Sequence, residues 1–492
     1  MRTIIGLYVK TGNEWMETGS SFQTKNERRQ HIFDSCLDKL RGNLQQFGAY
    51  RVLVEGGGYQ KIWLETQPMG GEMYAGVDME AALNNSLLFL RYQREDGRMP
   101  GSIAFRDGVL VPEYNKFQGF CFPWHALNLY YLCGRDAEYL GALREGLQGM
   151  HQYLTKYRKN PATGVLQSFC VYDTGEDNAV RFADSPNYWT EDARPEGYRI
   201  VPMDSMDVTS WDFAACDTLR EIAAILKDER EEKKWNQCAQ QIRDNLRTAL
   251  WNDRLDACFD RDAHGHVMPQ LIHNNLRCMY WGSFSQNMAD RFVEKHLLNP
   301  KEFWTRLPLP SVAVSDPDFR NAPENNWSGQ CEGLTFQRAV LALERYGKTE
   351  IMTEIGRKFL DALADGGYVY PQQFDPLTGK PTIVGMISHA PLKPGDTEPA
   401  QDAYGPTMLA ALEYLAHMEG IDIEFDHVLF SAVQGETFEA ARKWGEHEYV
   451  LSSDGVTAKA YLDGRLLSAF PAGCRMVTGT DGVPVSELVR LG

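Results

Sequence analysis

Apolar residues recur at intervals of three and four along most of this chain, which is the spacing of one face of an α-helix. The pattern predicts ten helices, over residues 26–47, 77–94, 119–132, 137–157, 208–226, 233–250, 286–298, 329–346, 350–364 and 404–418. Period-two alternation, the signal of a half-buried strand, does not recur before the C-terminal part. The chain is therefore expected to be mainly α-helical.

The C-terminal part carries a different pattern. Short alternating stretches at residues 448–451, 458–462 and 465–469 predict strands, and the Asp-Gly pairs at 454–455 and 463–464 predict hairpin turns between them. We expect a helical catalytic domain over residues 1–427, which includes a short N-terminal segment, and a small β-rich segment over residues 428–492. No repeat of fixed period is visible, which argues against a helical repeat array.

Composition narrows the class of protein. With 492 residues, 43% of them apolar, the chain can bury a large core without disulfide bonds. Its 67 acidic residues exceed its 50 basic ones and no long Lys/Arg run is present, so neither a nucleic-acid nor an anionic-membrane surface is expected.

Segments for export or membrane insertion are not expected either. No apolar stretch approaches the roughly 20 residues that span a bilayer, and the stretch at residues 4–9 is shorter than a secretory signal requires. The ten cysteines show no metal-ligand spacing, so we expect reduced, mostly buried thiols in a cytoplasmic protein with neither metal nor cofactor. Association between copies of the chain is left open.

Three connections between the expected helices are unusually long, at about residues 158–206, 299–328 and 365–403. Long connections in compact domains are commonly functional, and these contain many aromatic residues beside carboxylates. Aromatic rings pack on the C–H faces of sugars, and charged groups bind the hydroxyls. The connections therefore predict a sugar-binding cleft, although aromatic residues that only anchor loops onto helices would give the same composition.

The first of these connections contains the sequence Asp173-Thr174-Gly175-Glu176-Asp177. A general acid for glycoside cleavage must hold its proton near neutral pH, and neighbouring carboxylates raise a carboxyl pKa by like-charge repulsion. Three carboxylates within five residues could supply that repulsion. On the residues alone, a solvated turn or a weak metal loop remains an alternative, and the EF-hand spacing is not matched.

The stretch from Asp173 to Arg181 resembles the Ser-Gly-x-Asp-Asn-Ser-x-Arg loop of glycoside hydrolase family 63, which includes mannosylglycerate and glucosylglycerate hydrolases, and more weakly the Glu-Ser-Gly-Trp-Asp loop of trehalases. Further similar blocks follow the same order, at residues 95–100, 122–126, 326–329 and 374–379. The resemblance covers about residues 50–425. It implies an (α/α)6 barrel with its active site in the loops at one end, and Asp177 as the general acid.

The general base departs from this resemblance. In the related families a glutamate precedes the aromatic-x-Pro-x-Thr-Gly loop, whereas Gln372 stands there in this chain. A neutral amide cannot take a proton from water. Glu398, in a segment similar to one of trehalases, and Glu332 are the candidates for this role, although each also fits a structural position. We expect Asp177 to face one of them at the roughly 6.5–9.5 Å separation of inverting hydrolases.

Ten further residues are predicted to bind the sugar. Trp63 would be a platform for the ring in a glycine-rich stretch that matches no phosphate-binding motif, and a purely structural turn is its alternative. The complete set is Trp63, Gln67, Glu72, Tyr74, Trp124, Asn178, Arg181, Trp327, Gln330 and Gln372. His273, Asn274, Asn275 and His389 are additional polar candidates. A carboxylate on the aglycone would need a cation, for which Arg98 and Arg181 are candidates.

These features predict an exo-acting glycoside hydrolase that cleaves a short α-glycoside, a disaccharide or a glycosylated small acid, with inversion. A phosphorylase is one alternative, because phosphorolysis needs no carboxylate base and would explain Gln372. A non-catalytic sugar-binding protein on a hydrolase scaffold is the other. The sequence does not fix the sugar or the linkage.

Overall fold

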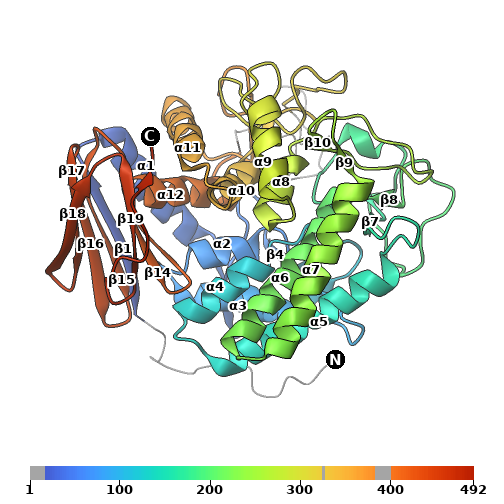
Figure 1. The fold of residues 1–492 in the computed structure, drawn as a ribbon, viewed down its shortest axis with the longest axis horizontal. Helices are drawn as coiled ribbons and strands as arrows, with labels where there is room; N and C mark the ends of the chain where they lie inside the picture. The colour runs from blue at the N-terminus through green and yellow to red at the C-terminus, as the bar shows by residue number, and fades with distance from the viewer. Residues whose placement is uncertain (1–16, 324–326, 383–400) are drawn as a thin grey trace.

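The computed structural model describes residues 17–323, 327–382 and 401–492 (Figure 1). The helices within these residues are α1 (Glu27–Gly42), α2 (Gln67–Met73), α3 (Met79–Arg91), α4 (Pro123–Leu132), α5 (Ala137–Tyr157), α6 (Met206–Ile225), α7 (Glu229–Ala249), α8 (Asn274–Trp281), α9 (Gln286–Phe292), α10 (Gly333–Glu344), α11 (Thr349–Asp365) and α12 (Gly405–Glu419). A π-helical turn, Val293–Leu297, continues α9. The ten expected helices are confirmed, and α2 and α8 are additional.

Side-chain caps fix where several helices begin. Asp136 accepts hydrogen bonds from the amides of Glu138 and Tyr139 at the start of α5. Ser205 accepts one from Val208 at the start of α6, two residues before the expected boundary. Such caps satisfy amides that have no partner within the helix.

The even-numbered helices form a ring. α2 contacts α4, α4 contacts α6, and the contacts continue through α8, α10 and α12 back to α2. Odd-numbered helices pack outside it, with α3 on α2, α5 and α7 on α6, and α11 on α10 and α12. Burial follows the same division, because α10 is almost wholly buried whereas α7 buries only Trp235, Ala239 and Leu246.

The strands are β1 (Thr18–Thr24), β2 (Leu44–Phe47), β3 (Tyr50–Leu53), β4 (Lys61–Trp63), β5 (Ser102–Arg106), β6 (Val109–Glu113), β7 (Gln167–Ser168), β8 (Met203–Asp204), β9 (Trp251–Asn252), β10 (Ala257–Cys258), β11 (Cys331–Glu332), β12 (Gln373–Phe374), β13 (Gly420–Glu424), β14 (His427–Ala432), β15 (Thr437–Trp444), β16 (His447–Asp454), β17 (Thr457–Leu462), β18 (Arg465–Pro471), β19 (Cys474–Gly479) and β20 (Val489–Arg490). The three predicted C-terminal strands correspond to β16, β17 and β18.

The C-terminal strands form two antiparallel sheets, in the orders β1-β15-β16-β17-β18 and β13-β14-β19-β20. We call these strands the β module. Figure 1 shows β1, in blue, beside the red strands, and the pairing runs from Thr18 opposite Trp444 to Thr24 opposite Phe438. The β module thus includes an N-terminal strand and begins at β13, before residue 428, which the sequence pattern did not predict.

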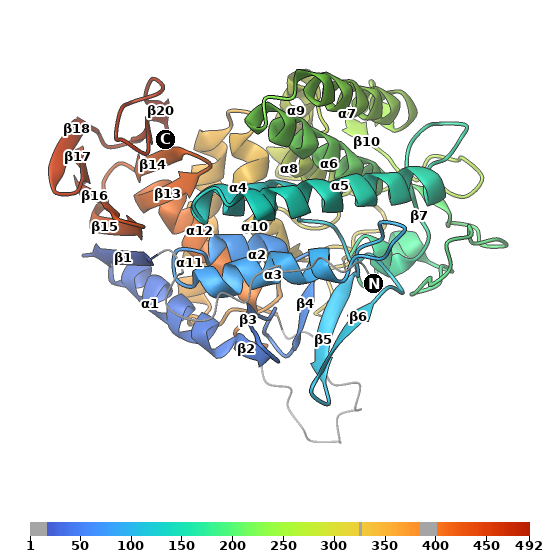
Figure 2. The same ribbon diagram turned by 90° about the horizontal axis from the view of Figure 1, so that it is seen from below.

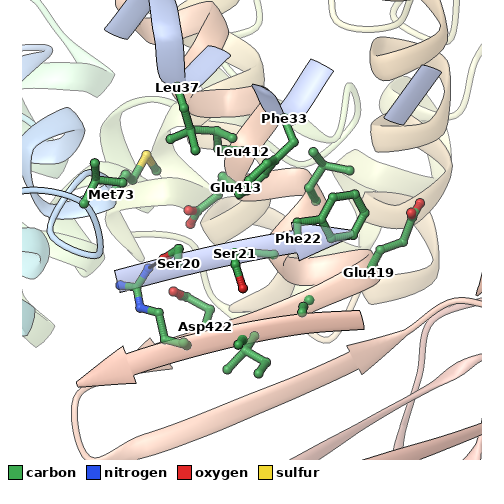
Figure 3. A pocket seen from close by; sticks show the side chains of 18 residues that line it. Ser20, Ser21, Phe22, Phe33, Leu37, Met73, Leu412, Glu413, Glu419 and Asp422 are labelled. Atoms are coloured by element: carbon green, nitrogen blue, oxygen red, sulfur yellow. Dashed lines mark hydrogen bonds between the residues drawn. The ribbon is translucent and has the colours of Figure 1, made fainter. Parts of the chain in front are cut away.

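Charged side chains are buried where the helical ring meets the β module. His417 of α12 lies between Glu344, 3.0 Å from Nδ1, and Asp422 and Glu413, which are 3.3 and 3.4 Å from Nε2. Arg475 of β19 pairs with Glu344 at 2.6 Å. A cavity of about 70 Å³ lies beside this network, between α1, α12, β1 and β15 (Figure 3). The two parts of the chain are therefore joined by ion pairs as well as by apolar contacts.

The expectations on membrane-spanning helices and on the cysteines can be compared with the structure. No helix among the described residues has the length and apolar character needed to cross a membrane. All ten cysteines are free thiols, and seven of them are buried.

Candidate active site

Asp177 lies between two 3-10 turns, Val171–Asp173 and Val180–Phe182. The amide of Trp327 donates a 3.1 Å hydrogen bond to the carbonyl of Asp177, and the amide of Val180 donates a 2.8 Å bond to Oγ of Ser328. Two of the three long connections therefore meet at Asp177, whose side chain is half-buried.

The other carboxylates of this loop are not the source of like-charge repulsion. Asp173 is fully buried and pairs with Arg158 at 2.6 Å, which holds the pKa of Asp173 below its usual value against the effect of burial. Glu176 pairs with Arg181 and lies 3.8 Å from Arg277, and these arginines lower the pKa of Glu176 well below normal. The expectation that three neighbouring carboxylates act together is wrong, because arginines neutralise two of them.

Carboxylates from distant parts of the chain surround Asp177 instead. Burial raises the pKa of Glu55, Glu65 and Glu332, to about 7 for Glu65, and the negative charge of Asp177 adds to each increase. We call Glu55, Glu65, Asp177 and Glu332 the acidic cluster. Buried like charges of this kind are the usual means of keeping a carboxyl protonated near neutral pH.

Three members of the acidic cluster lie beside the starts of inner helices. Glu332 is the N-cap residue of α10, without a side-chain capping bond, and Glu65 lies two residues before α2. Glu55 accepts a 3.0 Å hydrogen bond from the hydroxyl of Tyr404, the cap residue of α12. Helix N-termini carry partial positive charge, which favours carboxylates at these positions.

Glu332 is held by a short strand pair. Strands β11 and β12 place Glu332 opposite Gln373, whose Nε2 donates a 2.7 Å hydrogen bond to Oε1 of Glu332. The second carboxylate oxygen is also buried and accepts no hydrogen bond from the described residues. Next to this pair, Gln372 accepts a 3.1 Å hydrogen bond from the hydroxyl of Tyr59, and its carbonyl accepts the amide of Gly333.

Gly175 sets the position of the loop against Glu65. Its φ is +73°, and a Cβ at this residue would lie 2.3 Å from Oε2 of Glu65. Only glycine combines this backbone conformation with such a close approach. Oε1 of Glu65 accepts a 2.5 Å hydrogen bond from Arg338, which holds the carboxylate that Gly175 approaches.

Trp63 lies with two lysines beside the acidic cluster. Nζ of Lys61 and Nζ of Lys116 are each 5.1 Å from the centre of the Trp63 ring. Lys116 is also 5.0 Å from the ring centre of Tyr188. Burial lowers the pKa of Lys116, while the charges of Glu113 and Asp177 oppose that change.

Some predicted sugar-binding residues lie with the acidic cluster and others do not. Trp327 contacts Asp177 through its backbone, Gln372 adjoins Glu332, and Asn178 is exposed beside Asp177 with a φ of +54°. Gln330 is buried and is held by Asn321 and Thr382.

The remaining predicted residues serve other contacts. Gln67 accepts a 2.7 Å hydrogen bond from the amide of Trp63. Glu72 binds His125 and Asn128. The charge of Asp422 adds to the effect of burial in raising the pKa of Glu72 to about 8, so Glu72 belongs to the network near the β module.

Tyr74 is buried, and the charge of Asp78, the cap residue of α3, adds to burial in raising the pKa of Tyr74 to about 12. Trp124 packs on His125 and Phe425. The structure does not bring Gln67, Glu72, Tyr74 and Trp124 together as one set of sugar ligands.

Neither arginine proposed for an acidic aglycone is available to one. Arg181 is buried between Glu176 and Asp260. Arg98 is fully buried, with Phe117 and Tyr153 beside its guanidinium. His273, with Nε2 3.4 Å from Glu176, has its pKa lowered by burial to about 4. Glu398, His389 and Asn326 lie outside the described residues.

Sequence reasoning did not single out Glu55, Glu65, Tyr59 and Lys116. The first three lie within the glycine-rich stretch, residues 55–74, from which Trp63 was chosen, and Lys116 follows β6. The local pattern contained no signal for them, because closure of the helical ring brings them to Asp177. Among described residues, the groups with metal-ligand geometry do not include the acidic cluster.

Glycoside hydrolysis uses a pair of carboxyl groups, one as acid and one as base or nucleophile. The sequence model of one protein family, the mannosylglycerate hydrolase MGH1-like glycoside hydrolase domain, matches residues 73–390 of this chain. The chain therefore belongs to this glycoside hydrolase family and is a glycosidase.

Solved structures show a related fold. The GH63 mannosylglycerate hydrolase from Thermus thermophilus in complex with glucose is 18% identical, covers 77% of this chain and 99% of its own, and has a TM-score of 0.60. Neutral trehalase Nth1 from Saccharomyces cerevisiae is 13% identical, with coverage of 75% and 74% and a TM-score of 0.56. The GH78 rhamnosidase of a Bacillus species is 13% identical over 89% of this chain and 40% of that one, with a TM-score of 0.60.

Proposed function

We propose that this protein is an inverting, exo-acting hydrolase of a short α-glycoside, built on an (α/α)6 barrel. The observation that carries the proposal is the meeting of the Asp177 loop with the segment that leads to Glu332: the amide of Trp327 donates a 3.1 Å hydrogen bond to the carbonyl of Asp177, and Glu332 lies five residues further along the chain. Inverting hydrolysis needs two carboxyl groups, one protonated and one ionised, with room for a water between them.

In the proposed reaction Asp177 is the general acid and Glu332 the general base. Asp177 gives its proton to the glycosidic oxygen as the bond from that oxygen to the anomeric carbon breaks. Glu332 takes a proton from a water whose oxygen forms the new bond to the anomeric carbon on the opposite face. The sugar leaves with inverted configuration, Asp177 becomes ionised and Glu332 protonated, and exchange with solvent restores both groups.

The electrostatics of the acidic cluster set a requirement for these roles, because Glu332 must ionise although burial favours its protonated form. Burial is the main cause of the raised pKa of Glu332, and the charges of Asp177 and Glu65 add to it. The amide of Gln373 and the charge of Arg277 favour the ionised form of Glu332. When Asp177 carries the proton, its repulsion is absent, and Glu332 ionises more easily.

Glu398 is the second candidate for the base, on the strength of its sequence context alone. Matched Glu332→Gln and Glu398→Gln variants separate the two assignments. The variant that lacks the base loses turnover by orders of magnitude. Azide, a nucleophile that needs no deprotonation, should restore its turnover and give a glycosyl azide as the product. The other variant changes mainly KM.

The proposed substrate is a disaccharide or a glycosylated small acid. Family membership and the mannosylglycerate hydrolase named among the solved structures support the second class. Lys116, which is buried beside Trp63 and lies 3.8 Å from Glu113, is the cation that we propose to pair with a carboxylate on the aglycone. Trp327, Asn178 and Gln372 would position the sugar. Ten free thiols support a cytoplasmic location.

The test is an NMR assay of trehalose, glucosylglycerate, mannosylglycerate, kojibiose and nigerose, with and without phosphate. We expect hydrolysis of one of them without phosphate, with the inverted anomer as the first product. A requirement for phosphate would select the phosphorylase, and saturable binding without turnover would select a sugar-binding protein. Asp177→Asn should lower turnover by orders of magnitude while largely preserving substrate binding.

A further inference from the structure

Two outer helices and one inner helix bring together two cysteines and a histidine that lie far apart in the sequence. His151 lies on α5, Cys216 on α6 and Cys238 on α7, and α6 packs against both of the other helices (Figure 2). One ligand atom from each residue lies within 4.8 Å of the other two. The residues are separated by tens of positions, so they form no short metal-binding motif in the sequence.

The separations suit a tetrahedral ion. Sγ of Cys216 is 3.5 Å from Nδ1 of His151, and Sγ of Cys238 is 3.8 Å from Nε2. The two sulfurs are 3.3 Å apart. With metal–sulfur and metal–nitrogen bonds of about 2.3 and 2.0 Å, tetrahedral ligand–ligand distances are about 3.5–3.8 Å. The two measured sulfur–nitrogen distances are to different ring nitrogens, and one ion takes only one of them. Zinc on Nε2 would therefore require the sulfurs to separate by about half an ångström and Sγ of Cys216 to turn from Nδ1 toward Nε2.

A carboxylate supports the imidazole from the other side. Asp212, one helical turn before Cys216 on α6, is buried and lies 2.8 Å from Nδ1 of His151. Metal-binding histidines usually donate their second ring N–H to such a carboxylate, which orients the ring and leaves Nε2 for the metal. Trp235 of α7 packs edge-on against the same ring, with centroids 5.4 Å apart.

We propose that His151, Cys216 and Cys238 bind one thiophilic divalent ion of the zinc class. Two thiols and one imidazole form the donor set that zinc favours over oxygen-seeking ions. Binding replaces the proton of each thiol with a metal–sulfur bond and releases two protons. His151 and Cys238 are half-buried, so the ion can enter from solvent, and the fourth position is left for water.

The site cross-links α5, α6 and α7 and shares no ligand with the acidic cluster, so the proposal is independent of the proposed catalytic function. Because a bound ion stabilises only the folded chain, it should raise the melting temperature. A disulfide between Cys216 and Cys238 is the competing use of the two sulfurs. The metal is favoured because the oriented imidazole has no role in a disulfide.

Cobalt(II) titration of the reduced full-length protein tests the site. We expect one equivalent to bind with thiolate-to-cobalt charge-transfer absorption and the visible bands of a tetrahedral ion, and zinc to displace it. Cys238→Ser and His151→Gln should lose the tetrahedral spectrum, whereas Cys474→Ser, at another half-buried thiol, should keep it. Asp212→Asn should weaken binding by about 10–100-fold.

Circular dichroism confirms that each variant is folded. No charge-transfer absorption in the wild type, or its persistence in Cys238→Ser, would overturn the proposal. So would a Cys216–Cys238 disulfide found by non-reducing peptide mapping after purification with zinc present. A zinc-dependent rise in melting temperature that Cys238→Ser abolishes and Cys474→Ser retains would support it.

Discussion

The hydroxyl of Tyr59 donates a 3.1 Å hydrogen bond to Oε1 of Gln372, the amide that stands where related families carry their base. Burial raises the pKa of Tyr59, and the charges of Asp177, Glu55 and Glu332 raise it further, so this pair adjoins the acidic cluster. Gln372 thus adds a neutral hydrogen-bonding group where another carboxylate would meet strong repulsion.

Gln372→Glu is therefore expected to reduce activity. A new charge beside Glu332 would raise the pKa of Glu332, and an increase of one unit lowers its ionised fraction about tenfold at pH values below that pKa. We expect kcat/KM to fall about tenfold at low pH and less at high pH. Gln60→Glu, at an exposed position, is the control. A gain in turnover would mean that position 372 is the natural place of the base.

The pH profile should depend on Glu332. As the base it must be ionised, and burial together with Asp177 and Glu65 raises its pKa above 4.5. Activity should therefore disappear as the pH falls through this raised value. Glu65→Gln removes one of the repelling charges, so the acid limb of kcat/KM should move to lower pH. An unchanged limb would indicate that another group is the base.

Gly175→Ala should disrupt the site more than backbone strain alone can explain. A residue with a side chain costs about 1–2 kcal/mol at positive φ. At Gly175 the added Cβ would also displace the carboxylate of Glu65 from Arg338. Gly367→Ala, at φ +76° with no neighbouring atom within 4 Å, measures the strain alone. Equal losses of unfolding free energy, with activity preserved, would contradict this reading of Gly175.

The helices and C-terminal strands could be predicted because their signals are local. Apolar periodicity predicted α5 over residues 137–157, the range that the structure shows, and the side chain of Asp136 caps its first turn. α2 was missed because Gly70 and Gly71 have low helix propensity, and burial of nearly every residue in it, rather than periodicity, stabilises the helix. β1 was missed because its partner β15 lies more than 400 residues away.

The same limit applied to the site. The sequence predicted Asp177 and, as one of two candidate bases, Glu332, whereas Glu55 and Glu65 reach Asp177 only through closure of the ring. Glu72 was expected there because it shares a stretch of sequence with Trp63. The α2 helix instead carries Glu72 to His125.

Lys116→Gln should discriminate between substrates. If Nζ of Lys116 pairs with a carboxylate on the aglycone, the variant should raise KM for a glycosylated acid about tenfold, and much less for a neutral disaccharide. Lys61→Gln is the matched control, because Lys61 lies at the same 5.1 Å from Trp63 but pairs with Glu113 at 2.7 Å, whereas Lys116 is 3.8 Å from that carboxylate. Equal changes for both substrates would assign Lys116 to packing against Trp63.

The buried charges beside the β module predict how stability depends on pH. Burial, with Glu344 and Asp422, raises the pKa of Glu424 to about 8. Between about pH 5 and 8 the folded chain keeps a proton on Glu424 that the unfolded chain has released. Unfolding therefore releases a proton, and the unfolding free energy falls as the pH rises, by up to about 1.4 kcal/mol per unit for one proton.

Glu424→Gln removes the group that releases this proton on unfolding. Its plot of unfolding free energy against pH should be flatter than that of the wild type between pH 5 and 8, whatever the absolute stability of the variant. Glu446→Gln, at an exposed turn of the same β module, should leave the slope unchanged. Chemical denaturation at several pH values measures all three slopes. A Glu424→Gln slope equal to that of the wild type would show that Glu424 is already ionised in the folded protein. The positive charges of His417 and Arg475 would then offset the effects of burial and of the neighbouring carboxylates on the pKa of Glu424.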